Sequence, residues 1–260
     1  MVLLLGSLSG CIGDISRNAI LTHTFSEPLG STTTAKADIS THTGNLTVDK
    51  LVDSEDVLAS GTLQYVKKFG SPTRSLSTIN DRATFKLRPS DKSQPWYHFP
   101  WKIFDAAIEW QVHFNPAVPW DLGLYSGGGH IKMDLAGMSI TNVSAETSGG
   151  NVFISLPDNA ANLSVVAKSG GGNVTVEVGS GLSGNNTLNA QSGGGKVIVH
   201  LPEGIAARII ATSGAGKVVV DSRFIKLDEK TFQSPEFEEA ADKVEITLTS
   251  GAGSVMVDTK

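Results

Sequence analysis

The chain has 260 residues, of which 40% are hydrophobic and 18% are charged, and its formal net charge is −5 at pH 7. Its basic residues are scattered, so neither the overall charge nor its distribution indicates a nucleic-acid partner. A single cysteine excludes an internal disulfide framework and any metal site built from several cysteines. A chain of this length forms one elongated domain or two compact ones.

The only cysteine lies near the N-terminus, in the stretch Leu8-Ser-Gly-Cys11. This stretch resembles a lipobox, the signal at which prokaryotic lipoproteins are cleaved and acylated. The apolar run before it is far too short to cross a bilayer, so we expect membrane attachment through a lipid on Cys11. We interpret residues 1–11 as the remnant of a lipoprotein-type signal; the alternative is a frayed apolar N-terminus with a buried free cysteine. Residues 12–35 are mostly polar and are interpreted as a tether or a first edge strand.

A serine–glycine motif recurs through the second half of the chain, each time before a short aliphatic run. The copies begin at Ser126, Ser148, Ser169, Ser192, Ser213 and Ser250. The first aliphatic residues after the glycines are Ile131, Val152, Val174, Val197, Val218 and Val255, at steps of 21, 22, 23, 21 and 37 residues. Seven positions before each lies a second apolar residue: Leu124, Ala145, Ala167, Ala190, Ala211 and Leu248. Self-similarity at a nearly fixed period is typical of a stacked repeat architecture.

Around both apolar positions the sequence alternates with period two, as in strands with one buried face. Val174, Val176 and Val178 are predicted to point inward, and Thr175 and Glu177 outward. Each repeat is therefore a strand, a glycine-rich corner, a second strand and a polar connection. We attribute the corner glycines to backbone with positive φ. The predicted fold is an all-β solenoid of two or three sheets; the alternative is an antiparallel sandwich with glycine-rich turns.

Residues 36–121 are expected to form an N-terminal β region. Ile39 and Leu46 again lie seven apart across a glycine and predict a degenerate opening rung. Two or three strand-like runs follow, at Gly61–Val66, Arg74–Ile79 and Ala83–Arg88. Residues 122–260 are assigned to the glycine-cornered repeats.

Residues 89–121 hold all four tryptophans and five prolines, which exclude a long helix. Two interpretations compete: a cap that closes the end of the stack, or an aromatic platform that binds sugar or peptide. We favour the cap, and assign Trp110 and Trp120 to it. Trp96 and Trp101, set among prolines, are the candidate partner-binding residues.

The last repeat is interrupted at residues 223–243, which are rich in Glu and Lys and contain Phe224, Phe232 and Phe237. An insertion between the strands of a repeat is expected to form a loop on one face of the stack. It is interpreted either as a binding loop or as a solvated excursion anchored by its phenylalanines.

The stretch Asn115-Pro-Ala-Val-Pro-Trp-Asp-Leu122, followed by glycine-rich repeats, resembles the bacterial toastrack or adhesin-like domain. Three later stretches of the chain also resemble this domain: Leu201-Pro-Glu-Gly-Ile205, Thr212-Ser-Gly-Ala-Gly-Lys217 and Phe232-Gln-Ser-Pro-Glu-Phe237. The resemblance covers residues 36–258. The same domain forms the C-terminal part of LiaF-type cell-envelope stress proteins. The resemblance implies a solenoid-like all-β fold, an envelope setting and no established enzyme activity.

No catalytic, cofactor-binding or metal-ligating residue is predicted. Calcium-binding solenoid repeats need an aspartate two residues after the glycines, and here that position is mostly aliphatic or aromatic. The histidines show no ligand spacing. Asp134, Glu177 and His200 are predicted to line up outward on successive rungs, but they are a thin acid–base set.

The leading prediction is a non-catalytic, lipid-anchored adhesion or interaction module on the outer face of the cytoplasmic membrane. Its expected partners are the membrane, through the lipid, and an envelope protein or polysaccharide. One alternative is a partner-binding component of an envelope-stress relay. A second alternative is a solenoid carbohydrate-active enzyme.

Overall fold

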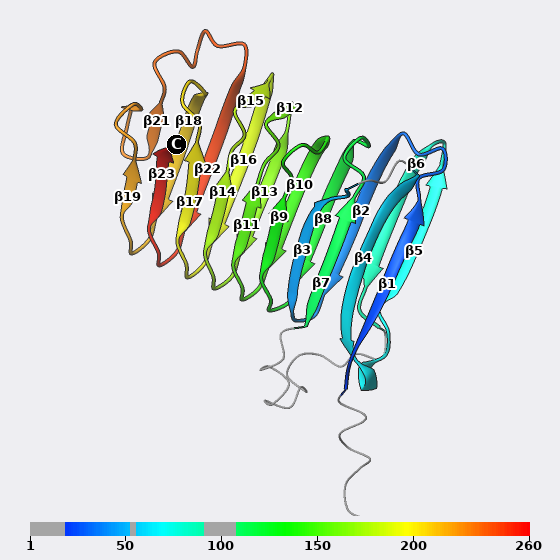
Figure 1. The fold of residues 1–260 in the computed structure, drawn as a ribbon. Coiled ribbons are helices and arrows are strands. Elements are labelled where there is room, and N and C mark those ends of the chain that lie inside the picture. Colours follow the sequence, from blue (N-terminus) through cyan, green and yellow to red (C-terminus); the bar gives the residue numbers. More distant parts are fainter. Residues whose placement is uncertain (1–18, 53–55, 91–107) are drawn as a thin grey trace, which may run out of the picture.

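The computed structural model describes residues 19–52, 56–90 and 108–260. These residues form two large β-sheets that lie face to face and enclose one core, with the N-terminal strands at one end and the C-terminal strands at the other (Figure 1). One short 3₁₀ helix, Lys67–Phe69, is the only helical element in these three ranges. The predicted all-β solenoid-like fold is confirmed.

Sheet A has ten strands and sheet B eleven, and a third sheet has two. In spatial order, sheet A contains β1 (Ile20–Pro28), β4 (Val57–Val66), β7 (Glu109–Phe114), β3 (Asn45–Lys50), β9 (Ile131–Asp134), β11 (Val152–Ser155), β14 (Val174–Glu177), β17 (Val197–Leu201), β23 (Val255–Thr259) and β19 (Val218–Val220). Sheet B contains β20 (Ile225–Lys226), β21 (Thr231–Gln233), β18 (Ala206–Ser213), β22 (Lys243–Ser250), β16 (Asn185–Ser192), β13 (Ser164–Ser169), β10 (Ile140–Thr147), β8 (Trp120–Ser126), β2 (Thr34–Thr41), β6 (Arg82–Arg88) and β5 (Thr73–Ile79). The short third sheet pairs β12 (Asn159–Ala161) with β15 (Gly181–Ser183).

Each rung consists of a strand of sheet B, a corner and a strand of sheet A, and neighbouring rungs pair in parallel. The predicted apolar positions are in register: Val174 pairs with Val152 and Val197, and Ala167 pairs with Ala145 and Ala190. Ile39 pairs with Leu124 and Leu46 with Ile131, so β2 and β3 form a rung of the same stack.

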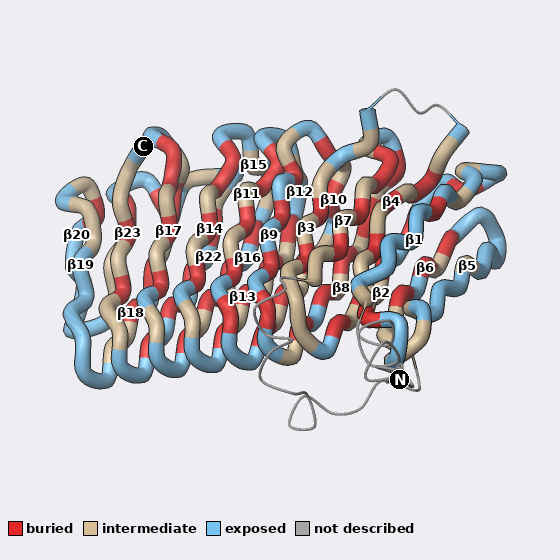
Figure 2. Tube along the Cα trace, turned by 60° about the horizontal axis from the view of Figure 1, so that its bottom comes forward, coloured by how far each residue is buried: buried red, intermediate tan, exposed pale blue. Residues whose placement is uncertain are grey.

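The alternation of buried and exposed residues follows the prediction. Val174, Val176 and Val178 are buried, whereas Thr175 and Glu177 are half-buried on the outer face. Figure 2 shows the same alternation along the strands of both sheets. Each buried aliphatic side chain contributes roughly 1.5–3 kcal/mol, so stacking the rungs supplies the stability that one rung lacks.

The corner glycines have a different cause from the one that the sequence suggested. None of those from Gly127 to Gly253 has φ in the left-handed region. Instead, a Cβ on Gly172, the third glycine of its corner, would lie 2.2 Å from the carbonyl oxygen of Gly150 in the neighbouring rung. A Cβ on the middle glycine, Gly171, would lie 3.5 Å from its nearest neighbour, an ordinary contact. The third glycine is therefore required by the close approach of two backbones.

Hydroxyl groups fasten these corners to one another. The N–H of Gly172 donates to the Ser169 hydroxyl at 2.8 Å, and this hydroxyl donates to the Gly150 carbonyl of the neighbouring rung at 2.7 Å. Thr147, Ser192 and Ser213 make the same pair of bonds. A serine or threonine at the start of each of these corners thus joins its own corner to a neighbouring one.

The order of the rungs in space differs from their order in the chain at both ends. The β22–β23 rung, which comes last in the chain, lies between the β16–β17 and β18–β19 rungs. At the other end, the β6–β7 rung lies outside the β2–β3 rung, and β8 and β9 return to the inner side of that rung. The 37-residue step from Val218 to Val255 therefore carries the chain back past the β18–β19 rung, to the place between that rung and the β16–β17 rung.

The N-terminal end is closed by β1 and β4 of sheet A and by β5 and β6 of sheet B. β1 and β4 pair antiparallel, as do β5 and β6. Residues 20–28, inside the segment interpreted as a tether or a first edge strand, form the edge strand β1. Aromatic rings fill this end: Phe85 packs on Phe25 and Phe114, and Phe114 packs on Trp120 with ring centroids 4.2 Å apart.

Trp110 and Trp120 are buried, but as members of the sheets. Trp110 lies in β7 and donates its indole N–H to the carbonyl of Gln64 at 2.9 Å. Trp120 lies in β8 and donates to the carbonyl of Asn115 at 2.9 Å. Leu87 pairs with Ile39 and Trp110 pairs with Leu46, so β6 and β7 form a rung beside the β2–β3 rung. Trp96 and Trp101 lie outside the described residues.

The insertion at 223–243 does not form a loop on one face. Its β20 and β21 form a hairpin, and β21 pairs antiparallel with β18, so the insertion extends sheet B at its C-terminal end. Phe224 and Phe237 are buried. The β18 strand would otherwise be the exposed edge of the sheet, and this hairpin covers it.

Candidate binding face

The outer face of sheet B carries a row of polar side chains, one from each of five neighbouring strands. In order across β8, β10, β13, β16 and β22 they are Tyr125, Glu146, Lys168, Gln191 and Thr249, and they are in register. We call these five residues the polar row. Adjacent strands lie about 4.8 Å apart, so the row spans roughly 19 Å.

A shallow groove of about 640 Å³ runs along the polar row. All five residues of the row line it, together with the corner residues Ser148, Ser169, Gly170, Ser192 and Gly193. The corner residues are small, so backbone and hydroxyl groups form one side of the groove. Its shape suits an extended ligand that crosses the strands.

The side chains of the polar row are held loosely. Lys168 and Glu146 form an ion pair at 3.2 Å with both side chains about 42–43% exposed, and such exposed pairs contribute little. The Tyr125 hydroxyl lies 3.2 Å from the Ser148 hydroxyl, and the tyrosine is 47% exposed. Because no partner here is deeply buried, these groups can exchange their hydrogen bonds for bonds to a ligand.

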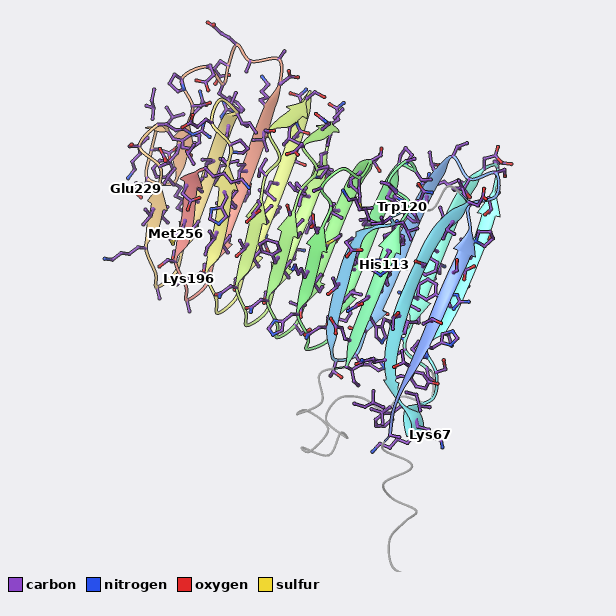
Figure 3. The ribbon with its side chains drawn as sticks, in the orientation of Figure 1. Lys67, His113, Trp120, Lys196, Glu229 and Met256 are labelled. Carbon is purple, nitrogen blue, oxygen red and sulfur yellow. The ribbon has the colours of Figure 1, made fainter. Side chains whose placement is uncertain are left out.

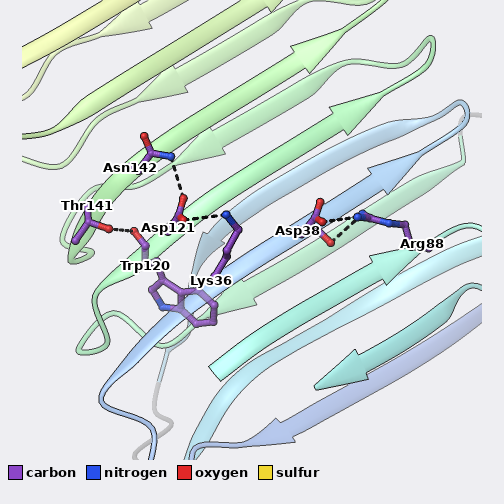
Figure 4. A network of polar contacts seen from close by, with 7 residues as sticks. All are labelled: Lys36, Asp38, Arg88, Trp120, Asp121, Thr141 and Asn142. Carbon is purple, nitrogen blue, oxygen red and sulfur yellow. Dashed lines mark hydrogen bonds and ion pairs between the residues drawn. The ribbon is translucent and has the colours of Figure 1, made fainter. Parts of the chain in front are cut away.

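A fixed polar network borders the row at the N-terminal part of the same face (Figure 4). Lys36 of β2 forms an ion pair with Asp121 of β8 at 3.1 Å, and Asn142 of β10 donates to the other oxygen of Asp121 at 2.9 Å. Arg88 of β6 pairs with Asp38 of β2. These contacts tie β6, β2, β8 and β10 together through their outer side chains, and β8 and β10 also present Tyr125 and Glu146 of the polar row.

The outer face of sheet A is different in character. Its register row contains Phe153, Ile198 and Met256, with Thr175 between the first two. A second row on this face contains the predicted acid–base set. Glu177 and His200 are indeed neighbours, but Ser155 separates Asp134 from Glu177.

Charged partners engage two members of that set. Glu177 forms an ion pair with Lys260 at 3.4 Å, and His200 pairs with Asp258. Within the three described ranges no group of three His, Cys, Asp or Glu side chains could hold a metal ion. The same residues include no helix long and apolar enough to span a membrane.

The polar row was missed at the sequence level, although a signal exists. Each of its residues directly precedes the serine or threonine that opens a corner, as in Tyr125-Ser126, Lys168-Ser169 and Gln191-Ser192. Aligning the repeats on that hydroxyl would have predicted the row. The sequence-based candidates Cys11, Trp96 and Trp101 all lie outside the described residues.

Known proteins resemble this chain in sequence and in fold. The family of the N-terminal domain of toast_rack, DUF2154, matches residues 15–177. A candidate cell adhesion protein from Clostridium sporogenes ATCC 15579 superposes with a TM-score of 0.65 at 18% identity, covering 93% of this chain and 100% of its own. A candidate adhesin from Bacteroides fragilis NCTC 9343 gives a TM-score of 0.41 at 12% identity, covering 92% and 97%. No curated protein matches the sequence. The Clostridium structure shares the fold with this chain.

Proposed function

The chain belongs to the toast_rack family, and from this premise we propose that it is a non-catalytic adhesion or interaction module of the cell envelope. In this proposal the polar row of sheet B binds an extended polysaccharide. The name of the Clostridium protein, a candidate cell adhesion protein, supports the adhesive role.

The observation that carries the proposal is the groove across five rungs. Tyr125 offers an exposed ring at one end, and Glu146, Lys168 and Gln191 offer carboxylate, ammonium and amide groups along its length. A chain of sugar rings presents hydroxyl groups that both donate and accept hydrogen bonds, and apolar ring faces that pack on an aromatic side chain. An elongated neutral polymer matches this arrangement better than a small compact ligand, because the groove is open and shallow.

Two features support a non-catalytic role. Glu177 is engaged in an ion pair with Lys260, and the His200 ring contacts the Asp258 carboxylate. The polar row contains no nucleophile beside a general base, since its one carboxylate is paired with Lys168. The row therefore has the chemistry of binding.

The decisive experiment measures binding of purified envelope polysaccharides to the full chain and to two aromatic variants. Tyr125→Ala is expected to weaken binding about tenfold, equivalent to roughly 1.4 kcal/mol. The matched control is Phe153→Ala, which removes a ring from the outer face of the opposite sheet. The proposal fails if both variants bind as the wild type does. A loss confined to Phe153→Ala would move the binding face to sheet A and favour a protein partner.

Anchoring to the outer face of the cytoplasmic membrane through Cys11 belongs to the same proposal, and the lipobox-like Leu8-Ser-Gly-Cys11 supports it. Two acyl chains hold a protein at a bilayer, at about 0.8 kcal/mol per buried methylene. Cys11→Ser, expressed with its native leader sequence, should move the protein from the membrane fraction to the soluble fraction. Retention of the serine variant on washed membranes would contradict lipid anchoring.

A further inference from the structure

Among the residues that the structure describes, no strand pairs with the outer edge of β19 or of β1, the two end strands of sheet A. We propose that the protein assembles head to tail, with β19 of one copy adding to β1 of the next, so that sheet A continues from copy to copy. This inference is independent of the polar row, because it rests on backbone groups and side chains at the ends of the stack.

The outer edge of β19 carries backbone N–H and C=O groups. In the inner rungs, the equivalent groups bond to the next strand of the sheet. The Val255 N–H donates to the Lys217 carbonyl, and the Asp221 N–H donates to the Val257 carbonyl, both at 2.9 Å. These bonds fix which residues face β23. Because alternate residues of a parallel strand bond to opposite sides, the N–H and C=O of Val218 and Val220 point away from β23. No described strand pairs with that edge.

The β1 strand presents a similar edge at the other end. The Lys67 N–H donates to the Ala19 carbonyl at 2.9 Å, which sets the phase of the antiparallel β1–β4 ladder. Ile20, Thr22 and Thr24 therefore direct their N–H and C=O groups away from β4. Within the described part of the chain, β1 has no second neighbour.

The two edges run in the same direction. All sheet A strands from β19 back to β7 are parallel, β4 is antiparallel to β7, and β1 is antiparallel to β4. Pairing β19 with β1 of a second copy would thus be parallel, like the pairing inside the stack. Such a contact joins two different surfaces, so it propagates instead of closing as a symmetric dimer.

Exposed apolar side chains gather at these ends. Val219 is 51% exposed on β19 and Ile20 is 41% exposed on β1, and Leu21, Ile79, Val218, Ile225 and Leu227 are also exposed on the terminal strands or directly beside them. Figure 2 shows the terminal strands β1, β5, β19 and β20 largely in the colour of exposed residues. Soluble proteins usually protect an edge with charges or proline, and the three valines of β19 do neither.

The ends carry opposite charge, which selects a second copy as the occupant. At the N-terminal end, residues 20–28 and 56–90 together hold six Lys and Arg against three Asp and Glu, a net charge of +3. At the C-terminal end, residues 206–245 hold six Lys and Arg against eight Asp and Glu, a net charge of −2. Lys67 and Glu229 lie at the two extremes of the molecule (Figure 3). Head-to-tail contact brings unlike charges together, whereas contact between two like ends would bring like charges together.

Sedimentation velocity of the full chain tests this proposal, in a Cys11→Ser background so that no lipid drives association. The weight-average mass is expected to rise with protein concentration and to fall with added salt. Val219→Lys places a cation on the β19 edge and should keep the protein monomeric. Met256→Lys is the matched control, because Met256 pairs with Val219 on the same face one strand further in. It should assemble as the parent does.

A second variant, which blocks the β1 edge, distinguishes head-to-tail assembly from a symmetric contact between two like ends. Thr22→Pro removes an outward N–H from β1 and should also give monomers. An equal mixture of Val219→Lys and Thr22→Pro has one free end of each kind and should yield heterodimers only. A parent protein that stays monomeric at every concentration overturns the proposal. So does a Thr22→Pro variant that still self-associates, or a Met256→Lys variant that is blocked as fully as Val219→Lys. Circular dichroism spectra matching the parent show that each variant is folded.

Discussion

The inner rungs of the stack and its N-terminal end are held together in different ways. In the inner rungs, small side chains such as Val174 and Ala167 repeat at the same places, and the backbones of neighbouring corners come into direct contact. At the N-terminal end, strands pair antiparallel and large rings fill the core, as Phe85 and Trp120 do. The stack depends on uniform spacing, whereas the end depends on side-chain volume.

The largest effect should come from a charge in the uniform core. Val176 is fully buried in β14, so Val176→Asp is expected to lower the free energy of unfolding by about 5 kcal/mol. Thr175→Asp, one residue away on the outer face, should cost well under 1 kcal/mol. Urea denaturation of both variants measures the difference. Equal destabilisation would mean that the two faces of β14 are not distinct.

Trp120→Ala tests the other half of the comparison. Trp120 is fully buried against Phe114 at a centroid distance of 4.2 Å, so its removal should cost about 3–4 kcal/mol. Trp120→Phe, which keeps a ring in the cavity, should cost less than half as much. Amide exchange should show faster opening in β6, β7 and β8 while β14 and β17 stay protected, because rungs contact only their neighbours. Uniform loss of protection would show that the two regions unfold as one unit.

The periodic half of this structure could be predicted residue by residue. Once Val152, Val174 and Val197 are aligned, a one-residue shift would turn every buried side chain outward, so the register is fixed. The opening rung at Ile39 and Leu46 was found in the same way. The reason for the corner glycines was not, because close approach between rungs depends on their spacing in three dimensions.

The order of the rungs could not be predicted, and the physical reason is the repetition itself. Ser213-Gly-Ala-Gly216 and Ser250-Gly-Ala-Gly253 have the same sequence, so either fits beside Ser192. The structure places Ser250 there, where its hydroxyl donates to the Gly195 carbonyl at 2.8 Å. Likewise, the β6–β7 rung was hidden because Leu87 and Trp110 lie 23 residues apart instead of seven. The polar row needed this three-dimensional register before its members could be recognised as neighbours.

An intermediate effect is expected from the glycines that distinguish the stack from the end. Gly172→Ala would place its Cβ 2.2 Å from a carbonyl oxygen and should cost about 1–3 kcal/mol, since two rungs must separate. Gly171→Ala, whose Cβ would lie at 3.5 Å, should be nearly neutral. The natural alanines Ala215 and Ala252 already occupy the middle position. Thermal unfolding of the pair measures the contrast, and equal melting temperatures would remove close approach as the reason for the third glycine.

The smallest expected effect is a loss of stability at low pH in the C-terminal end of the stack. A hairpin covers this end, whereas aromatic rings fill the other. Asp228 lies between β20 and β21, where its carboxylate accepts from the N–H groups of Lys230 at 2.8 Å and Thr231 at 2.9 Å. These bonds, that from Lys230 above all, hold the pKa of Asp228 below its ordinary value. A carboxyl with a lowered pKa in the folded state stabilises that state above the unfolded pKa, near 4, and the contribution is lost as the pH falls through the folded value.

Protection of the Lys230 and Thr231 amides should therefore decline below about pH 4. Asp228→Asn keeps the oxygen that accepts these bonds but cannot titrate, so its protection should change little over the same range. Amide exchange compared between the two proteins at each pH removes the intrinsic pH dependence of exchange. Parallel behaviour of the two proteins would show that the hairpin does not depend on this carboxylate.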